Sequence, residues 1–153
     1  MNGEAITETL LIAYKDLERY CDLVEHKVNK CIARSMFGDI YEAFDTMVKL
    51  TNEKIAYCNC KVIIDEALKG MTATELKLRY IKGLTIEQTA EATGQNERTI
   101  CRKVRSQKER LMLRILNEYK QEFLLQMIQD SPNLKRIYKR ACENNKGRKP
   151  DGR

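Results

Sequence analysis

Apolar residues recur every three or four positions over residues 5–35, and this spacing places side chains along one face of an α-helix. The steps of four and three form a heptad repeat, which Lys27 interrupts once. The pattern therefore predicts one long helix, and residues 35–38 predict the turn that ends it. Its apolar stripe consists of Ile6, Leu10, Ala13, Leu17, Tyr20, Val24 and Cys31.

A second apolar stripe follows that turn. Asp39 has Glu42 three residues later, a pair typical of a helix start, and Lys69 with Gly70 predicts the helix end. Two helices of about thirty residues joined by a short turn are expected to pack antiparallel. Their stripes suggest either a hairpin within one chain or a bundle in a dimer. The second stripe consists of Tyr41, Phe44, Val48, Ile55, Cys58 and Val62, followed by Ile63, Ile64, Ala67 and Leu68.

Three shorter helices separated by two tight turns are predicted over residues 72–111. Helix starts are indicated by capping boxes, in which Thr precedes Glu or Gln by three positions, and by a capping Asn. Helix ends are indicated by glycine, which adopts the left-handed conformation of a helix stop. The predicted starts are Thr72 with Glu75, Thr85 with Gln88, and Asn96, and the predicted stops are Gly83 and Gly94.

The third of these helices has one apolar face and one basic face. Ile100, Val104 and Leu111 are spaced by four and seven residues, so they share one side. Two helices joined by a short glycine turn are typical of a helix-turn-helix, whose second helix can lie in the DNA major groove. The alternative is an ordinary amphipathic helix with a solvated basic face. The side chains expected to face outwards are Arg98, Thr99, Arg102 and Arg105.

A resemblance to a known family is carried by residues 78–104, within the stretch 76–111 that makes up about a quarter of the chain. The matching positions are Leu78-Arg79-Tyr80, Gly83-Leu84-Thr85, Ala90, Gly94, Asn96 and Thr99-Ile100. They resemble region 4 of sigma-70-type factors, the domain that binds the promoter −35 element. The chain departs from that pattern at Thr89, Thr93 and Gln95, where the family usually has Ile, Leu and Val. The same module occurs in small transcriptional regulators of phages and mobile elements of Gram-positive bacteria.

The hypothesis is a sequence-specific transcriptional regulator that binds double-stranded DNA, with RNA polymerase and a second copy of the chain as further candidate partners. Glu97 could accept a hydrogen bond from cytosine, or only favour the helix N-terminus. Base edges are expected to be contacted by Arg98, Thr99, Arg102 and Arg105, and phosphates by Thr85, Gln88, Asn96, Lys103 and Lys108.

Charge is distributed unevenly along the 153 residues, whose net charge is +6. Residues 1–70 contain 9 basic and 12 acidic residues, a net charge of −3, which leaves +9 for residues 71–153. The basic part contains the predicted helix-turn-helix, as expected for a nucleic-acid-binding surface. No apolar run approaches the ~20 residues of a membrane span, and the N-terminus does not resemble a signal peptide, so a cytoplasmic protein is expected.

The C-terminal part is predicted to continue as helix. The recognition helix is expected to run on to about residue 130, where Ser131 and Pro132 start a last helix ending near Cys142. The predicted class is therefore all-α. The predicted units are an acidic hairpin for oligomerisation or partner binding (1–70), a helix-turn-helix domain (71–117), C-terminal helices (118–143) and a disordered basic tail (144–153).

Catalytic and metal-binding patterns are not found in the sequence. The six cysteines are scattered without a Cys-x2-Cys pair, and the single histidine is His26, so we expect reduced thiols, no cofactor and no enzyme activity. The few tyrosines of residues 1–70 lie at core-like spacings, which argues against a region that stacks on unpaired bases. The alternatives to a transcriptional regulator are an oligomerising DNA-recognition subunit of phage packaging and a polymerase-binding interaction protein.

Overall fold

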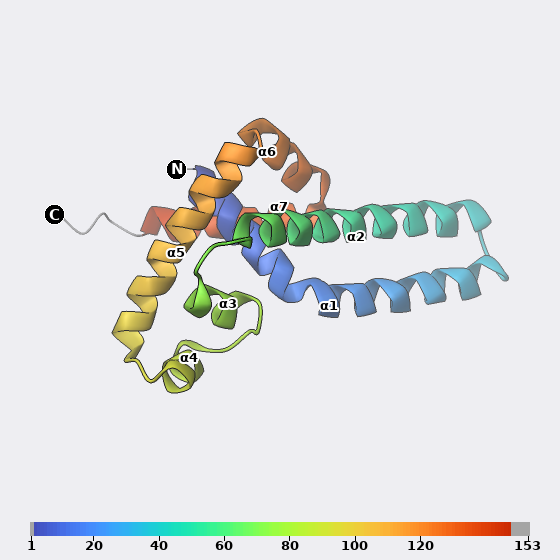
Figure 1. Cartoon of the computed structure of the whole chain (residues 1–153). Coiled ribbons are helices and arrows are strands. Elements are labelled where there is room, and N and C mark those ends of the chain that lie inside the picture. The colour runs from blue at the N-terminus through green and yellow to red at the C-terminus, as the bar shows by residue number, and fades with distance from the viewer. Residues whose placement is uncertain (1, 148–153) are drawn as a thin grey trace.

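The computed structural model describes residues 2–147 of the chain, and its regular elements are all α-helices (Figure 1). The predicted all-α class is thereby confirmed. None of the described helices is long and apolar enough to cross a membrane. In chain order the helices are α1 (Asn2–Ser35), α2 (Ile40–Leu68), α3 (Thr74–Tyr80), α4 (Ile86–Thr93), α5 (Glu97–Glu118), α6 (Gln121–Asp130) and α7 (Pro132–Gly147).

Helices α1 and α2 run antiparallel, and the turn between them projects away from the other helices (Figure 1). Asp39 caps α2, because its Oδ1 accepts hydrogen bonds from the backbone N–H groups of Tyr41 at 2.9 Å and Glu42 at 3.3 Å. This cap confirms the predicted start of the second helix. Nearer the other helices, the rings of Tyr20 and Tyr57 stack between α1 and α2 with centroids 4.1 Å apart.

The face of α2 that packs inside the protein is not the one predicted from the heptad pattern. Tyr57, Cys60 and Ile64 are buried, whereas the predicted stripe members Tyr41 and Phe44 are 85% and 64% exposed. The sequence contains two apolar stripes on this helix. The shorter one, which includes Tyr57, Cys60 and Ile64, is continuous with the apolar end at residues 63–68. That end reaches the main core, so the shorter stripe is buried. The end of the predicted stripe, Ile63, Ile64, Ala67 and Leu68, is buried as expected, whereas its earlier members Tyr41, Phe44, Val48, Ile55, Cys58 and Val62 are exposed.

One hydrophobic core joins α1, α2, α3, α5, α6 and α7 at the end of the molecule away from the α1–α2 turn. Gly3 allows α1 and α5 to approach closely here, since a Cβ atom at this position would lie 2.8 Å from Leu116 Cδ1. The core crosses the predicted boundaries at residues 70 and 117. Its fully buried members include Leu10, Ile64, Leu76, Leu111, Ile128 and Leu134.

The long recognition helix predicted to reach residue 130 is interrupted. Helix α5 ends at Glu118, Tyr119 has an extended backbone (φ −122°, ψ 133°), and α6 begins at Gln121. The prediction of one continuous helix was wrong because no glycine or proline marks the break. A change of direction at Tyr119 brings Leu124 and Ile128 into the core, where both are fully buried. Burial of these side chains therefore overrides the local helical preference.

Helix α7 starts at the predicted residues and ends later than predicted. Ser131 Oγ accepts a hydrogen bond from the backbone N–H of Leu134 at 3.2 Å, and Pro132 occupies the first helical position. The helix continues to Gly147 rather than ending near Cys142, so residues 144–147 of the predicted disordered tail are helical. The rest of that tail, residues 148–153, lies outside the described residues.

Candidate nucleic-acid interface

Helix α4 is capped at its N-terminus by two reciprocal hydrogen bonds. Thr85 Oγ1 accepts from the backbone N–H of Gln88 at 3.1 Å, and Gln88 Oε1 accepts from the backbone N–H of Thr85 at 2.9 Å. These bonds satisfy two amide groups that have no partner within the helix. The predicted capping box is confirmed, and it fixes the residue at which α4 begins.

Residues 94–96 connect α4 to α5 in a tight turn. Gly94 has φ 65° and ψ 23°, the left-handed conformation that glycine adopts without steric strain. Asn96 then caps α5, because its Oδ1 accepts a hydrogen bond from the backbone N–H of Thr99 at 2.8 Å. The predicted stop and cap are both confirmed. The turn leaves little freedom in the angle between the two helices.

The first turns of α5 carry cationic side chains on the side opposite the protein core. Arg98, Arg102 and Arg105 are exposed, whereas Ile100 is fully buried. Spacings of four and three residues place the three arginines on one side of the helix, which we call the arginine face. Thr99, the fourth residue predicted to contact bases, is half-buried at the edge of this face.

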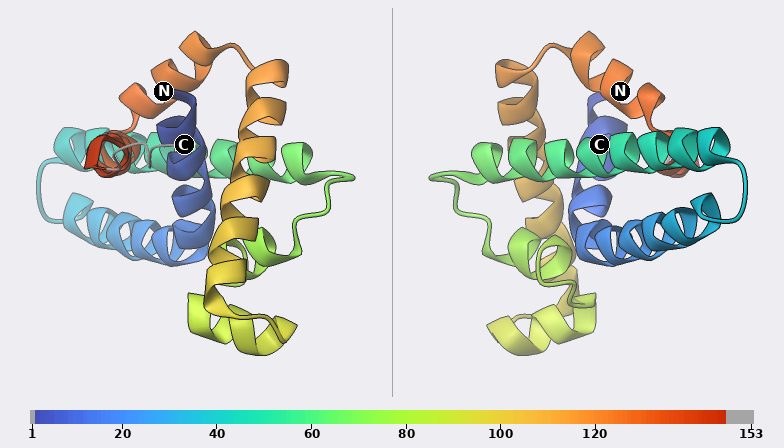
Figure 2. Two further views of the ribbon diagram at one scale, coloured as in Figure 1. Left: turned by 90° about the vertical axis from the view of Figure 1, so that its left-hand side faces the viewer. Right: turned by 90° about the vertical axis from the view of Figure 1, so that its right-hand side faces the viewer.

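The N-terminal end of α5 and helix α4 project beyond α1 and α2 (Figure 2). This end of α5 therefore lies apart from the α1–α2 pair. The N-terminal amides of a helix favour a nearby phosphate, since they carry a partial positive charge. Glu97 is exposed in this first turn and gives it an opposing negative charge.

Three of the predicted phosphate-contacting residues are the capping residues themselves. Thr85, Gln88 and Asn96 are exposed, and each uses an oxygen as acceptor in its capping bond. The hydroxyl proton of Thr85 and the side-chain NH2 groups of the two amides can still donate. Phosphate oxygens accept hydrogen bonds, so capping and phosphate contact are compatible at these positions.

The other two predicted phosphate contacts, Lys103 and Lys108, are bound within the protein. Lys103 Nζ lies 3.2 Å from Glu75 Oε1, and Lys108 Nζ contacts the Glu8 carboxylate. The Lys103 and Lys108 side chains are 43% and 24% exposed, so both are partly covered. At least one of the three donors of each ammonium group is therefore engaged within the protein.

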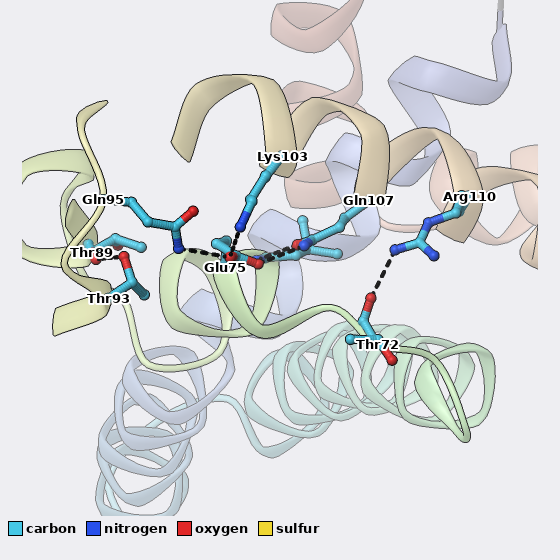
Figure 3. Close-up of polar contacts among 9 residues, drawn as sticks. Thr72, Glu75, Thr89, Thr93, Gln95, Lys103, Gln107 and Arg110 are labelled. Atoms are coloured by element: carbon cyan, nitrogen blue, oxygen red, sulfur yellow. Dashed lines mark hydrogen bonds and ion pairs between the residues drawn. The ribbon is translucent and has the colours of Figure 1, made fainter. Parts of the chain in front are cut away.

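Glu75 is the centre of a polar network between α3, the turn and α5 (Figure 3). Its Oε1 accepts from Gln95 Nε2 at 3.1 Å and from Lys103, while its Oε2 accepts from Gln107 Nε2 at 2.6 Å. Gln107 Oε1 in turn accepts from the backbone N–H of Leu76 at 2.8 Å. The carboxylate of a buried residue is thereby fully paired.

These hydrogen bonds lower the pKa of Glu75 to about 2, and the bond from Gln107 has the largest effect. Burial of the side chain acts in the opposite direction, but the donors outweigh it. Glu75 is therefore ionised at neutral pH, and its negative charge holds Gln95 and Lys103 in place. The carboxylate thus fixes α3 against the turn that precedes the arginine face.

The capping role predicted for Thr72 and Glu75 was wrong. Helix α3 begins at Thr74, with Ala73 as its N-cap residue and without a side-chain capping bond. The Glu75 carboxylate faces α5 instead, because two amides and an ammonium group bind it there. The carbonyl oxygen of Thr72 accepts a hydrogen bond from Arg110 Nη2 at 2.8 Å (Figure 3).

The polar residues at which the chain departs from the sigma pattern all have hydrogen-bond partners. Thr89 is fully buried, and its hydroxyl donates to the Thr85 carbonyl at 2.8 Å. The Thr93 hydroxyl donates to the Thr89 carbonyl at 2.8 Å, and Gln95 binds Glu75 (Figure 3). Substituting Thr and Gln for the expected aliphatic residues therefore leaves no unsatisfied polar group at these positions.

Sequence reasoning did not identify the role of Gln107. Gln107 is buried, and it lies on the same side of α5 as Ile100, Val104 and Leu111. A polar residue within an otherwise apolar helix face was the available signal, since such residues are usually paired when buried. That signal could have indicated a partner, but the sequence does not identify Glu75 as that partner.

The comparisons with known proteins provide no relative for this chain. No protein-family model matches it, and neither a curated protein sequence nor a solved structure does so. The described residues contain no cluster of His, Cys, Asp or Glu that could hold a metal ion. All six cysteines lie within residues 2–147 and are free thiols.

Proposed function

We propose that this chain is a sequence-specific DNA-binding transcriptional regulator of phage or mobile-element type, acting in the cytoplasm. In the proposal, α4 and α5 form a helix-turn-helix and α5 lies in the major groove of double-stranded DNA. The observation that carries the proposal is the arginine face, which lies opposite the buried side of a helix whose N-terminus is fixed by a tight glycine turn.

The chemistry of the arginine face suits base edges. An arginine side chain can donate two hydrogen bonds to guanine, which is worth ~1–3 kcal/mol of discrimination against other bases. Arg98 and Arg102 have no ion-pair partner among the described side chains, and Arg105 makes one exposed contact, in which Nε lies 3.5 Å from Glu109 Oε1. Contacts of this kind are weak in water, so Arg105 can exchange its partner readily.

Selection of bound sequences from a random duplex library tests the proposal. The purified protein should enrich a short sequence motif, and Arg102→Ala and Arg105→Ala should each weaken binding to it by ~1–3 kcal/mol, or about 5- to 150-fold. The matched controls are Arg136→Ala and Arg140→Ala, which remove exposed arginines from α7. If no motif is enriched, or if the control pair weakens binding as much as the α5 pair, the proposal fails.

Salt dependence separates DNA binding from the alternative of a protein-docking module for RNA polymerase. Affinity for DNA should fall steeply as salt rises, because each phosphate contact releases a counterion. The variant Asn96→Asp keeps the capping oxygen but places a negative charge where a phosphate is expected, so it should lower the slope of log affinity against log salt. Binding that is insensitive to salt between 50 and 200 mM (about the range in which such losses occur) would favour the docking module.

A further inference from the structure

Helix α2 presents a continuous apolar stripe to solvent, on the side away from α1 and the core. The stripe is formed by large apolar side chains that follow one another at spacings of three, four and seven residues. Thr51 and Cys58, both exposed, occupy the remaining positions of the heptad pattern. The exposed fractions are 85% for Tyr41, 64% for Phe44, 42% for Val48, 52% for Ile55 and 55% for Val62.

The geometry of this stripe is that of a coiled-coil seam. Residues 41–62 extend over about 30 Å at a rise of 1.5 Å per residue. Spacings of three and four keep such a seam facing a second helix over its whole length, with side chains interdigitating between the two helices. Exposed apolar surface arranged in this way is unusual on an isolated monomer and marks an interaction surface.

The charges beside the stripe differ between its two flanks. One flank carries Met47, Lys54 and Lys61, and the other carries Asp45, Asn52, Asn59 and Glu66. In a parallel pair of identical helices, each flank lies against the opposite flank of its partner. Lys61 of one copy would then lie near Glu66 of the other. An antiparallel pair would instead bring the two lysine-bearing flanks together.

We propose that the occupant of this stripe is a second copy of the chain, with the two α2 helices packed in parallel along residues 41–62. The opposite charges of Lys61 and Glu66, which would meet across the two copies, favour a second copy over an unrelated partner. Lys61 makes a half-exposed pair with Asp65 at 2.5 Å and lies over the Tyr14 ring of α1, and Glu66 makes an exposed pair with Lys69 at 2.7 Å. Ion pairs that water can reach are weak, so both can rearrange in the dimer. The proposal is independent of DNA binding and is tested without DNA.

Sedimentation equilibrium of the full-length protein provides the first test. The native chain should be a dimer that dissociates on dilution, and Val48→Asp and Ile55→Asp should each be monomeric. Both residues are exposed, so the helical circular dichroism spectrum should be unchanged. The matched control is Lys49→Asp, which introduces the same side chain one residue along, off the stripe, and should remain dimeric.

Cysteine cross-linking provides the second test and reports the orientation of the helices. In a parallel pair, Cys58 faces Cys58 of the second copy across the two-fold axis. Mild oxidation should therefore give a disulfide-linked dimer on a non-reducing gel. Cys58→Ser should abolish this band, whereas Cys101→Ser, which removes an exposed thiol from α5, should retain it.

Three outcomes would overturn the proposal. A native protein that is monomeric at 100 µM (about the concentration at which weak dimers with micromolar Kd form) would mean that something else covers the stripe. A dimer that persists in Val48→Asp and Ile55→Asp would place the interface elsewhere. A dimer that these changes disrupt, but that forms no Cys58 cross-link, would show that the helices are not parallel.

Discussion

Glu75 shows how one side chain fixes the relative positions of several elements. Its carboxylate binds a residue of the turn, Gln95, and two residues of α5, Lys103 and Gln107. A charged group with this many donors is stabilising only while it is ionised, because the protonated form accepts fewer hydrogen bonds. The position of the arginine face therefore depends on the ionisation of a residue on another helix, α3.

We expect Glu75→Gln to lower stability at neutral pH by about 2 kcal/mol, since charge-assisted hydrogen bonds are replaced by weaker ones. The pKa of Glu75 is lowered to about 2 in the folded protein, whereas an unfolded Glu has a pKa of about 4.3. The stabilisation is therefore complete above about pH 5 and is lost as the pH falls towards 2.

Thermal unfolding of the native chain and of Glu75→Gln between pH 7 and pH 2.5 measures this effect. The difference in Tm should shrink as the pH falls, because Glu75 of the unfolded chain, with its ordinary pKa, takes up a proton before Glu75 of the folded chain does. Glu91→Gln, at an exposed position of α4, serves as the control and should show no such convergence. A Tm difference that stays constant over this range would contradict the role assigned to the Glu75 charge.

At the scale of elements, the turn between α4 and α5 depends on the backbone conformation of Gly94. No atom lies within 4 Å of a Cβ built at this position, so space is not the constraint. A side chain at φ 65° is nevertheless strained. Gly94→Ala should therefore destabilise the protein by about 1–2 kcal/mol.

Chemical denaturation of three variants checks this reasoning. Gly94→Asn should lose less stability than Gly94→Ala, because Asn tolerates the left-handed region better. Gly147→Ala is the control, since its surroundings are equally open and its φ is not in the left-handed region. Equal stability of Gly94→Ala and the native chain would show that the turn adjusts without cost.

Most helix starts with a side-chain capping signal were predictable, whereas the buried face of α2 and the break at Tyr119 were not. The capping residues Asp39, Thr85 and Asn96 act locally, so their hydrogen bonds could be expected from spacing alone. The interruption at Tyr119 has no local signal and follows from burial of Leu124. The choice between two apolar stripes on α2 likewise depends on what the rest of the chain covers.

In the candidate site, the exposed arginines were predictable from the sequence, whereas the internal partners of the lysines were not. The exposure of Arg98, Arg102 and Arg105 follows from helical periodicity, which assigns one side of α5 to the core. The carboxylate partners of Lys103 and Lys108 lie in α3 and α1, far from these lysines in the sequence. Pairings between distant segments have no periodic signature, so the sequence alone could not show that both lysines are bound internally.

At the scale of the whole molecule, one core connects the α1–α2 pair to α5, the helix proposed to enter the DNA groove. Lys108 of α5 binds Glu8 of α1, and the Tyr80 hydroxyl of α3 donates to Glu8 at 3.0 Å. At the other end of the core, Glu53 of α2 accepts a hydrogen bond from Ser131 Oγ at 2.9 Å. The helices should therefore unfold together.

Leu10→Ala and Leu134→Ala should each destabilise the protein by about 2–5 kcal/mol, because both remove a fully buried side chain. Each variant should show coincident unfolding by circular dichroism and by tyrosine fluorescence. Leu113→Ala is the control, since Leu113 is 64% exposed, and it should change stability little. Separate transitions by the two probes would indicate independently folding parts.

Hydrogen exchange should be uneven along the α1–α2 pair. Between Val24 and Ala43 the only buried apolar residue is Cys31, so little apolar surface holds this region together. Amides near the turn should exchange faster than those of residues 57–68. Dilution to the monomer should widen this difference if α2 pairs with a second copy, because the stripe starts beside the turn.

The arginine face can acquire substitutions during evolution without loss of the fold. Arg98, Arg102 and Arg105 contribute nothing to the core, since they lie opposite the buried side of α5. Replacing them alters what the helix contacts while leaving what supports the helix unchanged. A library randomised at these three codons should thus consist mainly of folded proteins, so new binding preferences can evolve there without a compensating mutation elsewhere.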